Sequence, residues 1–447
     1  MTLRRCKPRR AATILTVVAI AALASWAHAE DAASQAAVQA VSADELYDHV
    51  STLSDDSFEG RLVGSCGGHA AAQYIVQQLQ KYPLKPAGND GDYFQPCQRG
   101  GRNILATLPG ADPQFRDQYI VVGAHYDHVG DGSQGHALGA IGQIYNGADD
   151  NASGVAELLE IIEVLANNHA NCRRSILFAF WDGEEMGMLG SKDWTARPTV
   201  PLTAVKLDVN LDMVGRLREG KLEVVGTRTG YNFRDLISGP LEEPLWLDYT
   251  WEIKANSDHW PFLEHQIPVV MFHTGLHPDY HKPTDDVDKI NREGMREIGR
   301  YLVATIVKAA DADKLPTYRP AGRDETLAQQ EAIEKPQSPA AALSHDAGAQ
   351  PPRLGITWRT DEAEPGSVIL TYVTPNSPAA VAGLATGDRI DAVNGQPFGD
   401  DEAFRTTVNG LLDGGAGDFT FEVESRGHVR TVTIHWRPPA LAAKSST

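Results

Sequence analysis

The chain is poor in cysteine, in positive charge and in long apolar runs. Its 447 residues include four cysteines, and 40 basic residues face 59 acidic ones, a formal net charge of −19 at pH 7. An acidic excess this large repels nucleic acid and anionic membranes, so neither is expected as a partner. No cysteine lies beside a candidate base, so thiolate catalysis is not expected either. Hydrophobic residues make up 42% of the chain, a globular composition that excludes a wholly disordered or collagen-like protein.

Residues 1–29 have the composition of a secretory signal peptide. A basic start precedes an apolar stretch over 11–24, and Ala27-His28-Ala29 fits a cleavage site. The apolar stretch is too short for an ordinary transmembrane helix, although an uncleaved anchor is the alternative. We therefore expect export to a periplasm or to the outside, with no stable membrane insertion after cleavage.

An exported protein can form disulfides. Cys6 would leave with the signal peptide, and Cys66, Cys97 and Cys172 would remain. We expect Cys66 to pair with Cys97, which leaves one free thiol.

Strand and helix patterns alternate between residue 41 and about residue 310. The pattern predicts apolar strands over 119–124, 175–181, 204–211 and 268–272, and a helix over 154–166 with Ser153 as its N-cap. Continuous apolar strands separated by helices predict an α/β domain over 30–312, with a mostly parallel mixed sheet sandwiched by helices. Ligands of such sheets bind where strands end and loops begin.

The last third of the chain differs in composition from the first domain. Residues 313–350 are rich in Ala, Pro, Gln and Glu, which predicts a linker with a helical part over 325–333. Residues 351–440 contain short strands, glycine-containing turns and one helix pattern over 401–412. They predict a second, smaller, β-rich domain.

Five short motifs rich in histidine or carboxylate follow strands of the first domain. Each has an ordinary explanation when taken alone, such as a helix cap, a solvated turn or a surface loop. They read GAHYDH at 123–128, NGADDNASG at 146–154, WDGEEMG at 181–187, NLDMVG at 210–215 and YHKPTDD at 280–286.

Together these motifs place two histidines and three carboxylates at strand ends of one sheet. A histidine in this position is a typical metal ligand, and an acid two residues later can fix its tautomer. This mixed nitrogen and oxygen set suits zinc, and five ligands are too many for one tetrahedral site. We therefore expect two zinc ions per chain, bridged by one carboxylate, and a spare glutamate as general base.

In this order the motifs resemble metallopeptidase family 28, the co-catalytic di-zinc aminopeptidases, over roughly residues 46–309. The resemblance implies that His125 and Asp212 bind one zinc ion and that Glu185 and His281 bind the other. It implies further that Asp150 bridges both ions, with Asp149 the less favoured choice.

The same resemblance assigns roles to residues around the metals. Glu184 would be the general base, Asp127 would orient His125, and Tyr280 would hydrogen-bond the tetrahedral intermediate. The run Ser257-Asp258-His259 resembles a supporting element near the site. The presence of His125 argues against the related glutaminyl cyclases, which resemble single-zinc sites without this histidine.

The expected activity is removal of N-terminal residues from peptides by a metal-bridged hydroxide. Two alternatives stay open: a carboxypeptidase or other amide hydrolase on the same site, and an inactive peptide-binding adaptor. The sequence does not indicate which substrate side chain is preferred. The insert at 131–145 could line the pocket or form a mobile surface loop.

Residues 353–436 resemble a PDZ domain. The resemblance rests on Leu354-Gly355-Ile356 and on AGLATGDRIDAVNG at 382–395. It implies that the loop at 354–356 binds the terminal carboxylate of a peptide ligand, which adds a strand to the sheet edge. Leu354 and Ile356 would border the side-chain pocket. The alternative is a degenerate module that only packs against the peptidase domain.

Overall fold

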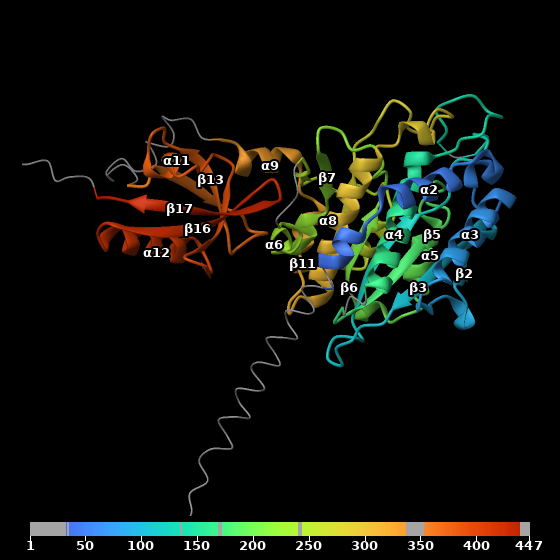
Figure 1. Cartoon of the computed structure of the whole chain (residues 1–447), viewed down its shortest axis with the longest axis horizontal. Coiled ribbons are helices and arrows are strands. Elements are labelled where there is room, and N and C mark those ends of the chain that lie inside the picture. Colours follow the sequence, from blue (N-terminus) through green and yellow to red (C-terminus); the bar gives the residue numbers. More distant parts are fainter. Residues whose placement is uncertain are drawn as a thin grey trace, which may run out of the picture.

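The computed structural model describes residues 33, 35–134, 136–168, 172–239, 244–336 and 353–438. It contains a large α/β domain and a smaller β-rich domain, with helix α9 (Leu327–Glu334) between them (Figure 1). The predicted signal peptide and residues 337–350 of the predicted linker lie outside the described residues.

The large domain is built on a nine-stranded mixed sheet with the order β1-β3-β5-β4-β6-β10-β7-β9, and β2 pairs with β3. The pairs β4–β5, β4–β6, β6–β10 and β7–β9 are parallel, and the others are antiparallel. The strands are β1 (Lys85–Pro86), β2 (Phe94–Pro96), β3 (Arg102–Leu108), β4 (Tyr119–His125), β5 (Ser175–Trp181), β6 (Val205–Leu211), β7 (Lys221–Val225), β9 (Trp246–Thr250) and β10 (Val269–His273). The predicted fold class and the four predicted strands are confirmed.

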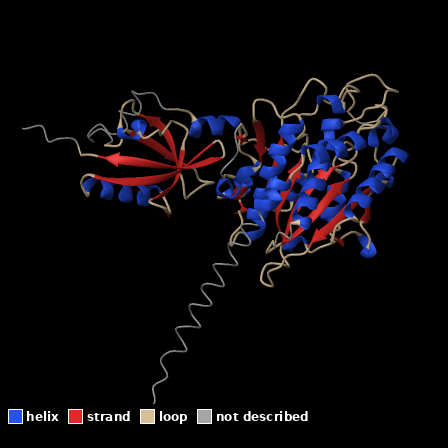
Figure 2. Ribbon diagram, viewed as in Figure 1, coloured by secondary structure: helices blue, strands red, loops and turns tan. Residues whose placement is uncertain are grey.

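Helices cover both faces of this sheet, as Figure 2 shows. Strand β5 is buried at every position because its alternate side chains enter two different cores. Phe178 and Phe180 belong to one core, and Leu177 and Trp181 belong to the other. The first core is completed by α2 (Ala43–Leu53), α3 (Cys66–Leu79), α4 (Gly154–Asn167) and α8 (Arg292–Asp311), and the second by α5 (Leu189–Ala196) and α7 (His259–Glu264). None of the helices in the described parts of the chain combines the length and apolar character of a membrane span.

Helix α4 begins as predicted, but Ser153 does not cap it. The Ser153 hydroxyl donates to the Asp149 carbonyl (2.7 Å) and accepts from the N–H of Val214 (3.0 Å). The N–H of Gly154 is instead satisfied by the Asn151 side chain at 3.0 Å. The cap prediction was wrong because the Ser153 backbone is itself helical (φ −63°, ψ −47°), whereas a capping residue is normally extended.

The second domain is a six-stranded antiparallel sheet with the order β12-β13-β14-β16-β17, and β15 pairs with β14. Phe404 of α12 and Phe421 of the sheet belong to its separate apolar core. Its elements are β12 (Ile356–Thr360), β13 (Val368–Val373), α11 (Pro378–Val381), β14 (Arg389–Val393), β15 (Gln396–Pro397), α12 (Asp401–Asp413), β16 (Gly417–Ser425) and β17 (His428–Trp436).

The first part of the predicted linker is folded, and the helix predicted within it over 325–333 is confirmed as α9. Strand β11 (Thr317–Tyr318) pairs with β8 (Gly230–Tyr231), and α9 begins with a capping box between Thr326 and Gln329. No residue of α9 is buried, so the helix has no apolar stripe that would mark it as part of a domain. Side-chain hydrogen bonds hold it in place, and this is why its composition resembles that of a linker.

The predicted pairing of Cys66 with Cys97 is wrong in this structure, where both are free thiols. Cys66 is exposed at the start of α3. Cys97 is partly buried, and burial together with the charges of Asp182 and Asp193 raises its pKa to about 12. A disulfide requires close, facing Cβ atoms, which spacing along the sequence does not reveal.

Candidate active site

The predicted site residues meet at one edge of the sheet. His125 is the last residue of β4, Asp212 directly follows β6, and Glu185 lies in the turn after β5. Asp150 precedes α4, and His281 lies in the loop after β10. Because β4, β5, β6 and β10 run in the same direction, their carboxyl ends lie side by side and bring these loops together.

One group of donors forms around His125. Its Nε2 lies 3.4 Å from Oδ1 of Asp150 and 3.5 Å from Oδ1 of Asp212. All three side chains are buried, and their donor atoms lie within 4.8 Å of one another. A single cation could therefore be reached by all three.

A second group shares Asp150 with the first. Oδ2 of Asp150 lies 3.0 Å from Nε2 of His281, and Oε2 of Glu185 lies 3.1 Å from the same nitrogen. Asp150 thus directs one carboxylate oxygen toward each group. Asp149 is directed elsewhere, since its carboxylate accepts from the N–H of Gly215 (2.7 Å).

The chemistry of this donor set fits two zinc ions. Buried carboxylates are costly unless they are paired or bind metal, and mixed imidazole and carboxylate ligands are typical of zinc. Burial raises the pKa of Glu185, but hydrogen bonds to His128 and His281 lower it below its ordinary value. Its carboxylate is therefore charged and available as a ligand.

Asp127 contacts residues at the carboxyl ends of two strands, β4 and β5. Nδ1 of His125 lies 3.2 Å from the Asp127 carbonyl oxygen and 3.7 Å from its carboxylate. The carboxylate itself accepts the N–H groups of Glu184 (2.9 Å) and Glu185 (3.3 Å). Asp127 therefore positions the two glutamates as well as lying beside His125, and the sequence indicated only the contact with His125.

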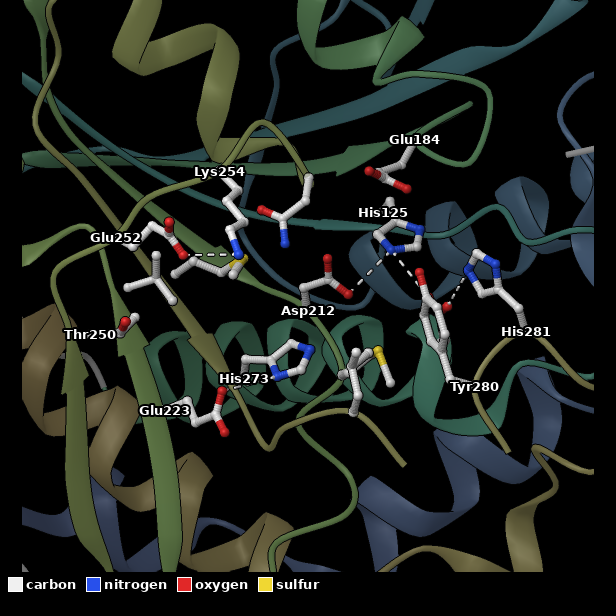
Figure 3. Close-up of a pocket in the computed structure, with 16 residues that line it drawn as sticks. His125, Glu184, Asp212, Glu223, Thr250, Glu252, Lys254, His273, Tyr280 and His281 are labelled. Atoms are coloured by element: carbon white, nitrogen blue, oxygen red, sulfur yellow. Dashed lines mark ion pairs between the residues drawn. The ribbon is translucent and has the colours of Figure 1, made fainter. Parts of the chain in front are cut away.

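Glu184 and Tyr280 border the open side of the site (Figure 3). Burial and the charges of Asp258 and Glu185 raise the pKa of Glu184, against the opposing effect of His125. The Tyr280 ring stacks on His281 with centroids 3.9 Å apart. Burial and nearby carboxylates raise the pKa of Tyr280, so its hydroxyl remains a proton donor.

The run Ser257-Asp258-His259 lies next to these residues. Ser257 Oγ accepts from Asn210 Nδ2 (2.7 Å), and Asp258 is hydrogen-bonded by Ser191. Nε2 of His259 bonds the main chain of Lys254 (3.0 Å). These contacts tie the loop before α7 to the end of β6.

Three residues of the site were missed by the sequence analysis. His128 Nδ1 lies 2.7 Å from Oε1 of Glu185, and the Asp285 carboxylate accepts the N–H groups of Asp149 and Asp150 at 3.0 Å each. His128 lies in the motif at 123–128 and Asp285 in the motif at 280–286, so the sequence contained a signal for both residues. Arg61 is 1% exposed and donates to the carbonyls of Tyr126, Leu53, Asn146 and Gly147. It had no motif around it.

The site opens into a cavity of about 370 Å³ (Figure 3). The described residues of the insert, 131–134 and 136–145, do not line it. The insert instead contacts a candidate ligand, because the His136 carbonyl lies 3.0 Å from His281 Nδ1 and the N–H of Leu138 donates to the His281 carbonyl (2.7 Å). The cavity is lined by His125, Asp150, Glu184, Asp212, Met213, Glu223, Val225, Thr250, Glu252, Lys254, Asn256, Met271, His273, Leu276, Tyr280 and His281.

The predicted carboxylate-binding loop of the second domain precedes β12. Gly355 has φ +78°, and a Cβ there would lie 2.3 Å from Cβ of Ser377, so glycine is required. Leu354 and Ile356 are each 2% exposed and belong to the core of the domain. Among the described strands β12 pairs only with β13, so its outer edge is open for a further strand.

The fold and the site define a class: α/β domains with a buried histidine and carboxylate centre at the carboxyl edge of a mixed sheet. Residues 103–306 match peptidase family M28, and residues 369–410 match the PDZ domain. The chain therefore contains a domain of peptidase family M28 followed by a PDZ domain.

Several curated relatives share part of the chain. It is 31% identical over 194 residues to a probable leucine aminopeptidase of Arthroderma otae, covering 42% of this chain and 48% of that one. It is 30% identical over 207 residues to aminopeptidase YwaD of Bacillus subtilis, covering 44% and 42%. The chain thus spans about half the length of the curated relatives it matches.

Solved structures share the fold at lower identity. The LapA aminopeptidase of Legionella pneumophila has a TM-score of 0.51 at 20% identity, covering 63% of this chain and 75% of that one. An aminopeptidase from Aneurinibacillus sp. strain AM-1 has a TM-score of 0.50 at 19% identity, covering 64% and 98%.

Proposed function

We propose that this chain is a zinc-dependent exopeptidase, most simply an aminopeptidase, that uses two zinc ions per chain to remove N-terminal residues from peptides. The observation that carries the proposal is the position of Asp150, whose two oxygens face the two donor groups. The match to peptidase family M28 and the relatives named as aminopeptidases support the same conclusion.

His125 and Asp212 would hold one ion, Glu185 and His281 the other, and Asp150 both. When bound, the ions would polarise the scissile carbonyl and lower the pKa of the attacking water.

The remaining residues move protons and orient groups. Glu184 takes the proton of the attacking water and delivers it to the leaving amine. Its main-chain N–H is held by Asp127 at 2.9 Å, which keeps the side chain at the rim of the site. The Tyr280 hydroxyl donates to the oxygen of the tetrahedral intermediate.

The test combines metal content with three substrates. The purified chain should contain about two zinc ions and should release a chromophore from an aminoacyl anilide, and a chelator should abolish the release. An N-acetylated anilide should be resistant, since the proposal requires a free amine. Cleavage of the acetylated substrate would favour another amide hydrolase, and cleavage of a peptide from its carboxyl end would favour a carboxypeptidase. Zinc binding without any cleavage would favour an adaptor.

We propose further that residues 1–29 direct export and are removed, which places the enzyme in a periplasm or outside the cell. Fractionation of cells that express the full chain, with N-terminal sequencing of the exported product, tests this directly. A product that starts at Met1 and stays with the membrane would contradict it.

For the PDZ domain we propose that Leu354, Gly355 and Ile356 receive the carboxylate of a peptide ligand whose strand extends β12. The domain should bind C-terminal peptides and lose them when the carboxylate is amidated, as measured by fluorescence polarisation. Equal binding of both forms would contradict the proposal.

A further inference from the structure

Strand β9 is at one edge of the nine-stranded sheet, and the chain that follows it forms one wall of the cavity. Thr250, Glu252, Lys254 and Asn256 line the cavity. Figure 3 shows Thr250 and Glu252 on the side opposite Tyr280 and His281. The odd-numbered residues Tyr249, Trp251 and Ile253 are buried, at 7%, 4% and 7% exposed, and the alternation ends at Ala255, which is exposed. The alternation is that of an extended chain with two different faces.

The outer edge of this extended chain is completed by the C-terminal part of the protein. The β16–β17 hairpin bonds its start, since the N–H of Leu247 donates to the Arg426 carbonyl (2.8 Å) and His428 Nε2 lies 2.8 Å from the Leu245 carbonyl. Gln330 of α9 forms two hydrogen bonds with the chain at the end of β9. The Gln330 amide donates to the Tyr249 carbonyl (2.9 Å) and accepts the N–H of Trp251 (3.2 Å). An edge strand would otherwise expose its main-chain N–H and carbonyl groups. Here several of these groups are hydrogen-bonded by the PDZ domain and by α9, which both follow the peptidase domain in the sequence.

Two arginines cover the buried side chains of the wall. The guanidinium of Arg234 lies 3.7 Å from the ring centre of Tyr249, and that of Arg228 lies 3.3 Å from the ring centre of Trp251. Both contacts have the geometry of a cation–π interaction. The aromatic residues behind the cavity wall therefore depend on where these arginines are held.

The PDZ domain pairs with both arginines, and Glu325, which precedes α9, also accepts from Arg228 Nη2 at 2.9 Å. Arg234 pairs with Glu424 at 3.3 Å, and Arg228 Nη1 donates to both oxygens of Asp361 at 2.7 and 2.8 Å. Asp361 also accepts from Arg389 at 3.0 Å, and its side chain is fully buried. A buried carboxylate between two guanidinium groups needs both partners, because removing one leaves an uncompensated charge.

We propose that the PDZ domain and helix α9 are a structural part of the substrate cavity, and that Gln330 and Asp361 are positioning residues for its wall. The domain is thus neither a tethered appendage nor only a peptide-binding module. The cavity-lining side chains share one backbone with Tyr249 and Trp251, so they cannot move independently of the contacts that hold those residues. The predicted effect on substrate binding rests on the proposed function.

The experiment uses full-chain variants. Gln330→Ala removes both hydrogen bonds to the wall, and Asp361→Asn keeps the shape of the side chain but removes its charge. Glu331→Ala, an exposed position on the same helix, is the control for the first variant. Asp413→Asn, in an exposed pair with Arg353, is the control for the second. Each protein is measured for hydrogen exchange of residues 246–256, for zinc content, and for KM and kcat on an aminoacyl anilide.

We expect Gln330→Ala and Asp361→Asn to exchange faster in 246–256 and to raise KM by about tenfold, since small displacements of positioning groups have effects of this size or larger. The fall in kcat should be smaller than the rise in KM, and zinc content should match the wild type, because the metal ligands lie on other strands. Gln330→Glu keeps an acceptor for Trp251 but no donor for Tyr249, so it should be intermediate. Both controls should behave as the wild type.

The proposal is overturned if Gln330→Ala exchanges over 246–256 at the rate of Glu331→Ala, or if KM stays at the wild-type value while that segment exchanges faster. If Asp361→Asn fails to fold, the variants Gln330→Ala and Gln330→Glu still test the proposal. A wild-type protein that cleaves no substrate would defeat the proposed function. The exchange measurements would still test whether the C-terminal segments hold the wall.

Discussion

Replacing His128 with leucine should weaken the second metal site and leave the first unchanged. His128 Nδ1 lies 2.7 Å from Oε1 of Glu185, and both side chains are buried. A hydrogen bond to a charged group contributes about 1.5–3 kcal/mol, which is roughly a 10- to 150-fold change in affinity. Loss of a residue that orients a metal ligand typically costs about 10- to 100-fold, so two independent arguments give the same range.

The assay is a zinc titration against a competing chelator, which resolves two dissociation constants. The first constant should stay near the wild-type value, because His128 approaches Glu185 and only the Oδ2 atom of Asp150 (3.9 Å), whereas Oδ1 of Asp150 faces the first group. His128→Gln retains a donor and should recover part of the loss. Two unchanged constants, or an equal loss at both sites, would refute the reasoning. Complete loss of the second ion would mean that His128 is itself a ligand.

Other perturbations have equally definite outcomes. Glu184→Gln should lower kcat by about 10²- to 10⁴-fold with two zinc ions still bound; a normal kcat would exclude Glu184 as the base. Removal of zinc by a chelator should abolish turnover, and readdition of zinc should restore it; activity that survives removal would exclude a metal-dependent reaction. Burial raises the pKa of Asp361, but Arg389 and Arg228 lower it to about 2 from its ordinary 3.8. A lowered carboxylate pKa stabilises the folded state above pH 4 by about 2 kcal/mol, and this contribution is lost as the pH falls from 4 through 2. The difference in unfolding free energy between wild type and Asp361→Asn should shrink over this range, and a constant difference would contradict the assignment.

Much of the site could be predicted because it obeys a local rule. An apolar run such as residues 175–181 becomes a buried strand whatever its neighbours are, and the structure has this strand with the predicted bounds. Polar residues that directly follow such runs must lie at strand ends. Once the strands are parallel, His125, Glu185 and Asp212 must share one edge of the sheet.

The errors fall where structure depends on specific partners. Helix α9 was predicted as a helical part of the linker, but its packing was not, because that depends on contacts such as the pair of hydrogen bonds from Gln330 to the chain at the end of β9. The prediction that Cys66 pairs with Cys97 was wrong for the same reason, because a disulfide depends on the relative position and direction of two side chains.

The sequence by itself determined the α/β class, the β-rich second domain and the residue types of the site, because periodicity and strand-end chemistry are properties of short segments. Only the tertiary structure decided that His128 faces Glu185 and that Asp149 faces away. The tertiary structure also decided that Asp361 pairs with Arg228, 133 residues away in the sequence, next to the cavity wall. Contacts of this kind depend on the path of the whole chain, and no local pattern of residues records that path.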